Sequence, residues 1–317
     1  MVSLLPSGTE IVCLVGGEAS LVARSHECDF PPSVTHLPVL TKARTQGLDP
    51  ALIDRQVREA AASGTSLYEL DVDLLKALAP DVILTQDLCS ACSVDLAAVR
   101  RAAADMPHPP TILSLSPETV EGVLDDVLRV GEAIGRVEAA TRAAVALRER
   151  LFAASEHVNP FDDGPSVAFL EWTSPLFVGG HWVPQLIERA GGRHPLNPTV
   201  PRESAGAAIG PQMAERVAGK SVVVSPDAFD ASKPDWIIIC PCGVDLHAAI
   251  VMAKDLAQHD WFRETPAARS GRVVVVDGNQ MFARPGPRLA DAFEFLVGLI
   301  NDRPDLIPSG FPWAKLR

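Results

Sequence analysis

The chain contains 317 residues, of which 47% are hydrophobic and 21% are charged, and this balance excludes a disordered or collagen-like protein. Its length fits about two globular domains, and its longest apolar runs fall well short of the roughly 18 residues of a membrane span. The 28 basic and 40 acidic side chains give a net charge of -12, which repels nucleic acids and anionic membrane surfaces, so we expect no nucleic-acid partner.

The first residues do not have the pattern of a secretion signal. Met1 is followed directly by Val2, Ser3 and Leu4, without a basic region and a separate apolar region. We therefore expect a cytoplasmic protein as the sequence stands, or a periplasmic or extracellular protein if a leader has been removed.

Strand-like apolar runs alternate with helical patterns in the first part of the chain. The runs at residues 81–85 and 111–115 each follow an amphipathic stretch, at residues 70–78 and 94–104. This alternation is typical of a parallel α/β sheet.

The middle of the chain, residues 116–158, has a helical pattern throughout. Ser116 and Pro117 predict the start of a first helix, as its N-cap and first residue, and this helix ends near residues 131–135. A second helix is predicted over residues 136–155, and at 1.5 Å per residue it is roughly 30 Å long. The Pro- and Gly-containing segment at residues 159–165 ends it.

A second series of strand-like runs begins after this helix, at residues 167–170, 221–224, 236–239 and 272–276. We expect two Rossmann-like α/β lobes with mainly parallel sheets, joined by one long helix, with a ligand cleft between the lobes. The predicted boundaries are residues 1–135 for the first lobe, 136–157 for the linking helix and 158–317 for the second lobe. One continuous sheet with these helices on its face is the alternative.

Ligands of open parallel sheets bind beyond the carboxyl ends of the strands, so the loops that follow the predicted strands are the candidate site. Their side chains are unusually rich in polar, aromatic and thiol groups. These loops are residues 5–10, 25–29, 86–92, 171–175, 240–243 and 280–285.

Several motifs resemble a known family. The N-terminal motifs at residues 2–12, 26–32 and 80–86 look like those of cobalamin-binding proteins that serve ABC importers. The motifs at residues 182–192 and 284–289 are similar to that family and to its iron-chelate-binding relatives. The resemblance covers nearly the whole chain. It implies two lobes on a helical backbone with little hinge motion, a corrinoid or other metal chelate as ligand, and the permease of an ABC importer as a partner.

The cysteines depart from the importer pattern. Cys89 and Cys92 form a C-x-x-C pair in one predicted lobe, and Cys240 and Cys242 follow a strand-like run in the other. Four thiolates in one cleft would suit zinc or an iron–sulfur cluster, and Cys28 is a further candidate ligand. Buried reduced thiols under tight turns, or a redox disulfide, are the alternatives.

Polar residues of the first lobe are the next candidates. His26, Glu27 and Asp29 could supply an imidazole or carboxylates to a ligand, although they could equally serve only to turn the chain before Pro31. Ser7 and Gln86, in neighbouring strand-end loops, complete the predicted ligand contacts of this lobe.

Aromatic and charged residues are the candidates in the second lobe. Trp172, Trp182 and Phe282 are predicted in or next to turns, where flat apolar side chains could stack on a macrocycle. Glu171 lies beside the first of these. Arg284 could bind a carboxylate or phosphate through bidentate hydrogen bonds. A structural hydrogen bond to backbone carbonyls is the alternative role.

The sequence contains no nucleophile elbow, phosphate-binding loop, dinucleotide fingerprint or H-E-x-x-H motif. We therefore predict a non-enzymatic binding protein that holds a corrinoid or other metal-bearing small molecule. The alternative hypothesis is a cytoplasmic metalloprotein on the same fold, with a cysteine-ligated zinc or iron–sulfur site and a redox or enzymatic role.

Overall fold

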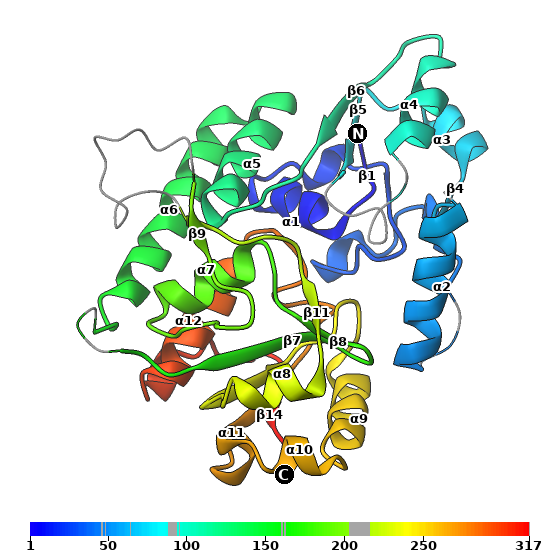
Figure 1. Cartoon of the computed structure of the whole chain (residues 1–317). Helices are drawn as coiled ribbons and strands as arrows, with labels where there is room; N and C mark the ends of the chain where they lie inside the picture. Colours follow the sequence, from blue (N-terminus) through cyan, green and yellow to red (C-terminus); the bar gives the residue numbers. More distant parts are fainter. Residues whose placement is uncertain are drawn as a thin grey trace. The chain divides into compact units, whose positions relative to one another are not determined.

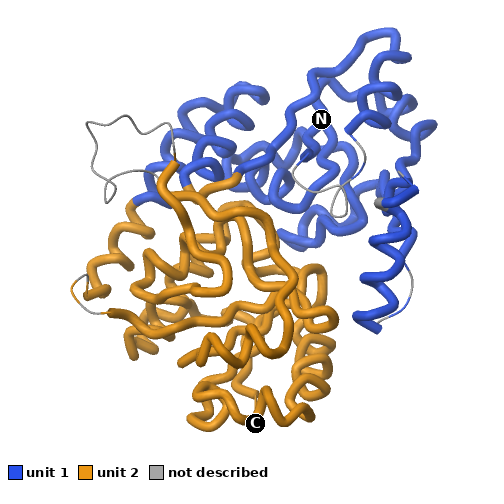
Figure 2. The backbone as a smooth tube through the Cα atoms, in the orientation of Figure 1, with its two compact units in different colours: residues 1–117, 121–148 blue, residues 118–120, 149–317 orange. Residues whose placement is uncertain are grey.

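A four-stranded and a six-stranded β-sheet, each with surrounding helices, organise the described chain (Figure 1). The computed structural model describes all residues except 46, 48, 64, 88–93, 95, 160, 162, 203–215 and 317. The described chain divides into unit 1, residues 1–117 and 121–148, and unit 2, residues 118–120 and 149–317 (Figure 2). Among the described residues, no helix is both long enough and apolar enough to cross a membrane.

Unit 1 is built on a four-stranded sheet in which every strand is parallel to its neighbours. In spatial order the strands are β2 (Ala23–Arg24), β1 (Val2–Ser3), β5 (Val82–Thr85) and β6 (Thr111–Ser114). The antiparallel pair β3 (Thr41–Ala43) and β4 (Tyr68–Leu70) lies outside this sheet. The helical segments are α1 (Pro6–Leu14), η1 (Glu18–Ser20), η2 (Pro32–Val34), α2 (Pro50–Ser63), α3 (Val72–Leu78) and α4 (Leu96–Ala104).

Local sequence explains how these elements pack. The Asp71 side chain caps α3 by accepting a 2.9 Å hydrogen bond from the Leu74 amide. Gly8 allows α1 to lie close to the sheet, because a Cβ atom there would come within 3.2 Å of Leu84. The interior of the unit is apolar, with Leu75, Ile83 and Val99 fully buried in one cluster.

Helices α5 (Val120–Ala133) and α6 (Val137–Ser155) connect the two series of strands. The helix predicted over residues 136–155 is confirmed as α6. The predicted start of the preceding helix is wrong, because α5 begins at Val120 and not at Pro117. Ser116 is not its cap: the hydroxyl instead accepts a 3.0 Å hydrogen bond from the Asp87 amide and so ties two strand-end loops together.

Unit 2 is built on a six-stranded mixed sheet. In spatial order its strands are β11 (Val222–Val224), β8 (Leu176–Val178), β7 (Val167–Thr173), β12 (Trp236–Ile239), β13 (Val273–Val276) and β14 (Trp313–Lys315). A short pair, β9 (Val200–Pro201) and β10 (Arg216–Val217), lies apart from it. The helical segments are α7 (Trp182–Arg189), α8 (Pro226–Ala231), α9 (Leu246–Leu256), α10 (Asp260–Arg263), α11 (Pro266–Arg269), α12 (Leu289–Ile300) and η3 (Pro304–Leu306).

The centre of this sheet is parallel and its flanks are antiparallel. β7, β12 and β13 pair in parallel, as the sequence predicts. The run at residues 221–224 does form a strand, but it pairs antiparallel with β8, which itself folds back on β7. The prediction of two α/β lobes is therefore confirmed, with a mixed sheet in the second.

Candidate functional site

The carboxyl ends of the parallel strands of unit 1 form one edge of its sheet, where ligands of such sheets bind. Backbone bonds hold the loops at this edge together. The Ser25 amide, after β2, donates to the Ser3 carbonyl of β1 over 2.8 Å, and the Leu4 amide donates to the Leu84 carbonyl of β5 over 2.9 Å. The loop after β2 is thus fixed beside the start of α1.

Polar side chains gather at this edge in what we call the His26 cluster, made of Ser25, His26, Glu27, Thr41 and Tyr68. The Thr41 hydroxyl lies 2.7 Å from His26 Nδ1 and 2.9 Å from the Ser25 hydroxyl. The Tyr68 hydroxyl donates a 2.9 Å hydrogen bond to Glu27 Oε1. The ring centres of His26 and Tyr68 lie 5.5 Å apart, so an imidazole, a phenol and a carboxylate share one small region.

The electrostatic surroundings favour a neutral imidazole at His26. Partial burial lowers the pKa of His26 below its ordinary value, and Arg24 lowers it further, while Glu27 acts in the opposite direction. Nε2 of this ring has no hydrogen-bond partner among the described residues. A neutral imidazole with one nitrogen unoccupied has the chemistry to bind a metal or to hydrogen-bond a bound molecule.

The other predicted residues of unit 1 lie in different environments. Ser7 is buried in the first turn of α1 and Asp29 is exposed, whereas Gln86 is partly buried directly after β5. Cys28 is fully buried, with its thiol 3.9 Å from the Ser3 carbonyl. The Cys28 thiol therefore packs in the interior of unit 1, and its predicted role as a metal ligand stays a prediction.

Two of the three predicted stacking aromatics of unit 2 are core residues. Trp182 is 6% exposed and its indole Nε1 donates a 2.7 Å hydrogen bond to the Phe282 carbonyl. Phe282 is 2% exposed and packs edge-on against Phe169, with ring centres 4.9 Å apart. Phe282 lies in a bend and Trp182 begins α7 directly after a turn, as predicted, but both rings are buried. Their contact with a ligand stays a prediction. Trp172 is partly exposed, but it lies inside β7 and not in a turn.

Glu171 and Arg284 stabilise loops of unit 2. The Glu171 carboxylate accepts hydrogen bonds from the Ser221 hydroxyl and, over 3.3 Å, from the Gly180 amide. Arg284 is 5% exposed and donates a 3.2 Å hydrogen bond to Asn279 Oδ1. Both side chains therefore have partners within unit 2, and their predicted ligand contacts stay predictions.

The two described cysteines of unit 2 lie in different environments. Cys240 is 2% exposed with its thiol 3.6 Å from the Met281 carbonyl, and burial raises its pKa well above the ordinary value, whereas Cys242 is exposed. Cys89 and Cys92 lie outside the described residues. Within the described part of the chain, no three His, Cys, Asp or Glu side chains are grouped to hold a metal ion.

A tight backbone contact holds the loop of Cys240 and Cys242. A Cβ atom on Gly278, which follows β13, would lie 1.9 Å from the Pro241 carbonyl oxygen, so only glycine fits there. The Gly243 amide also donates to the Gly278 carbonyl over 3.1 Å. This contact sets the loop that follows β12 against the loop that follows β13.

A family model described as "Periplasmic binding protein" matches residues 1–279. The chain belongs to this family of periplasmic binding proteins. The family consists of solute-binding proteins and not of enzymes, and the resemblance predicted from the sequence motifs is confirmed. A comparison with curated protein sequences gave no match.

Several solved structures share the fold of this chain. A periplasmic heme binding protein from Pseudomonas aeruginosa is 19% identical with a TM-score of 0.66, covering 99% of this chain and 94% of that chain. The periplasmic vitamin B12 binding protein BtuF of Vibrio cholerae is 18% identical with a TM-score of 0.65, covering 96% of each chain. The apo periplasmic heme-binding protein RhuT from Roseiflexus sp. RS-1 is 21% identical with a TM-score of 0.66, covering 95% of this chain and 97% of that chain.

Two members of the His26 cluster of this periplasmic binding protein, Thr41 and Tyr68, lie outside every loop that the sequence predicted for the site, whereas Ser25 lies in the predicted loop at residues 25–29. Thr41 and Tyr68 lie 15 and 41 residues along the chain from their partners His26 and Glu27. The one available signal was that Tyr68 is the only tyrosine of the chain.

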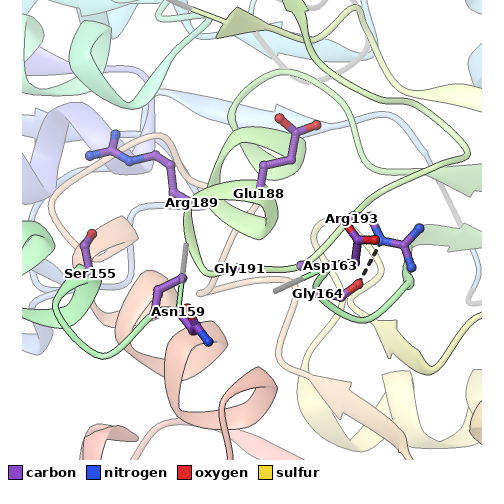
Figure 3. Close-up of a pocket in the computed structure, with 10 residues that line it drawn as sticks. Ser155, Asn159, Asp163, Gly164, Glu188, Arg189, Gly191 and Arg193 are labelled. Atoms are coloured by element: carbon purple, nitrogen blue, oxygen red, sulfur yellow. Dashed lines mark hydrogen bonds between the residues drawn. The ribbon is translucent and has the colours of Figure 1, made fainter. Parts of the chain in front are cut away.

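Unit 2 also has a surface hollow of about 460 Å³, away from the strand-end loops (Figure 3). It lies where α6 ends and where the chain leaves α7, and Arg193 Nε donates to the Gly164 carbonyl at its edge over 2.8 Å. The side chains of Arg189 and Arg193 point to opposite sides of it (Figure 3). Glu188, also at its wall, is already bonded to Thr199 and Arg216. The two arginines therefore do not converge on one point of this hollow.

Proposed function

We propose that this protein binds a metal-bearing tetrapyrrole, a corrinoid or a heme, as the solute-binding component of an ABC importer. Two of the similar structures are described as heme-binding proteins and one as a vitamin B12 binding protein, which supports this class of ligand. The observation that carries the proposal is the half-buried imidazole of His26 at the strand-end edge of the unit 1 sheet, with Nε2 unoccupied by the described residues. Partial burial lowers its pKa.

The chemistry of this imidazole suits the central metal of such a ligand. Imidazole nitrogens coordinate iron and other transition metals when they are neutral, and histidine is a common axial ligand of heme iron. The partial burial of His26 favours the neutral form that coordination requires. Glu27 and Tyr68 lie beside it as polar groups that could contact the rim of the ligand.

The described cysteines give less support to the alternative cysteine-ligated metal site. Cys240 is buried as a protonated thiol and Cys28 packs in the interior of unit 1. Metal analysis of the purified protein separates the two hypotheses. Bound cobalt or tetrapyrrole iron agrees with our proposal, whereas stoichiometric zinc, or iron without a tetrapyrrole spectrum, would contradict it.

An importer role places the proposed site of action outside the inner membrane, in contact with a permease. The sequence alone allowed both a cytoplasmic and an exported protein. Fractionation of the native producer with an antibody to this chain tests this part of the proposal. Recovery only from the cytoplasm would contradict the importer role without affecting the proposed ligand.

The binding proposal is tested by titrating hemin and hydroxocobalamin into the protein and following their absorbance. We expect saturable binding of at least one of them at one molecule per chain, with the spectrum of a nitrogen-ligated metal. His26→Ala should remove that spectral signature and weaken binding about tenfold or more, which corresponds to about 1.4 kcal/mol or more.

The matched control for this experiment is His36→Ala. His36 is an exposed histidine of the same unit, and its Nδ1 lies 2.7 Å from the Ser33 carbonyl. The control should bind like the unaltered protein. The proposal fails if neither tetrapyrrole binds, or if His26→Ala and His36→Ala behave alike.

A further inference from the structure

The hydroxyl of Thr41 is the centre of the hydrogen bonds around His26. It accepts a 3.0 Å hydrogen bond from the His26 backbone amide, lies 2.7 Å from His26 Nδ1, and donates over 2.9 Å to the Ser25 hydroxyl. One side chain therefore contacts both the backbone and the ring of the same histidine.

The hydrogen atoms available in this network determine which ring nitrogen of His26 carries the proton. A threonine hydroxyl has one hydrogen and two lone pairs. The hydrogen is donated to Ser25, so the hydroxyl can only accept from His26 Nδ1, and Nδ1 must carry the proton. In a neutral imidazole the other nitrogen, Nε2, then holds the free lone pair.

The backbone holds this hydroxyl firmly in place. Thr41 is 5% exposed and is the first residue of β3, where it pairs with Leu70 of β4. The preceding residue is tied to the end of β2, because the Leu40 amide donates to the Arg24 carbonyl over 2.9 Å. Ser25 is 2% exposed. The Thr41 hydroxyl, which accepts from the His26 ring, and the Ser25 hydroxyl, which accepts from Thr41, are therefore both buried and held in place.

We propose that Thr41 is a positioning residue that holds His26 as the Nδ1–H tautomer, so that Nε2 is the nitrogen presented to the metal of the bound tetrapyrrole. The role toward the metal rests on the proposed function, whereas the tautomer does not depend on any ligand. Hydrogen bonding of the second ring nitrogen orients metal-bound histidines and makes them stronger ligands. The Tyr68 hydroxyl donates its hydrogen to Glu27 and so does not donate to a ring nitrogen of His26.

The tautomer is tested in the ligand-free protein by nitrogen NMR of the His26 ring at a pH where the ring is neutral. We expect a protonated Nδ1 and an unprotonated Nε2. Thr41→Val should lose this preference, and Thr41→Ser, which keeps the hydroxyl, should retain it. A protonated Nε2 in the unaltered protein, or an unchanged tautomer in Thr41→Val, would overturn the proposal.

The effect on the ligand is tested with hemin and hydroxocobalamin. Thr41→Val should weaken binding about 10- to 100-fold and alter the metal-to-nitrogen spectral signature, with recovery in Thr41→Ser. Thr35→Val is the matched control, since Thr35 is exposed and, among the described residues, its hydroxyl donates to the Pro32 carbonyl alone. Equal binding by Thr41→Val and Thr35→Val would overturn the positioning role.

Two further outcomes keep the proposals separate. If neither tetrapyrrole binds but NMR finds the Nδ1–H tautomer lost only in Thr41→Val, the proposed function fails and the assignment of Thr41 to the tautomer stands. If Thr41→Val does not fold, as shown by its thermal unfolding, the NMR measurement on the unaltered protein and Thr41→Ser still decides the tautomer.

Discussion

Asp126 on α5 is a buried acid with an incomplete set of partners. Its Oδ1 accepts a 2.6 Å hydrogen bond from Arg129, whereas Oδ2 is buried and has no hydrogen-bond partner among the described residues. Burial raises the pKa of Asp126 from 3.8 to about 6, and the nearby Arg129 only partly offsets this effect. The folded protein therefore binds the Asp126 proton more tightly than the unfolded chain does.

This difference predicts a pH-dependent stability. The contribution of Asp126 is fully present below the unfolded pKa of about 3.8 and is lost as the pH rises through the folded pKa of about 6. The asparagine of Asp126→Asn cannot ionise. We therefore expect the free energy of unfolding of this variant, relative to that of the unaltered protein, to be higher at pH 7.5 than at pH 4. The difference should be at most on the order of 3 kcal/mol.

Urea unfolding at the two pH values measures this effect. Asp125→Asn is the matched control, because Asp125 is the exposed neighbour on the same helix. A relative stability of Asp126→Asn that is the same at both pH values would contradict the prediction.

Arg150 links helix α6 to α12 within unit 2. Arg150 donates to Glu294 over 2.9 Å and 2.6 Å, and to Asp291 over 2.5 Å. These two carboxylates raise the pKa of Arg150, so the side chain stays charged. The two acids lie one helical turn apart on α12 and would repel each other without the guanidinium.

We expect Arg150→Met to lower the free energy of unfolding by about 1–2 kcal/mol, because partly exposed carboxylates lose their shared partner. Arg142→Met is the control on the same helix, since Arg142 is exposed and lies 3.8 Å from Glu138. Chemical unfolding of both variants checks this. If both variants have the same stability, the contact between α6 and α12 does not depend on Arg150.

The elements also differ in how far local sequence determined them. The strands β5, β12 and β13 and the helix α6 lie where apolar runs and helical spacing predicted them. The start of α5 did not follow from Ser116 and Pro117, because the Ser116 hydroxyl bonds the Asp87 amide of a loop that is 29 residues distant. A local capping motif gives no information about a partner that is distant in sequence and competes for the same hydroxyl.

At the scale of the whole molecule, binding and folding are linked. A ligand that binds only the folded protein should raise its free energy of unfolding by about 2.7 kcal/mol at a concentration of 100 times Kd. We expect hemin or hydroxocobalamin, whichever binds, to raise the urea midpoint of the unaltered protein and of His36→Ala, and to shift that of His26→Ala much less. Binding seen by absorbance without any shift of the midpoint would indicate adsorption that does not distinguish folded from unfolded chain.

The sequence by itself determined the α/β class, the two series of strands, the long helix α6 and the family resemblance. These depend on the period of apolar residues and on short contiguous motifs, both of which are local. It also identified His26 and Glu27 as candidates.

Only the tertiary structure decided what surrounds the candidates. It buried Trp182 and Phe282 against each other, and it brought Thr41 to His26 and Tyr68 to Glu27. Such contacts join residues that are 15 to 100 positions apart. They follow from strand order and from the burial of whole segments, which no local pattern of side chains encodes.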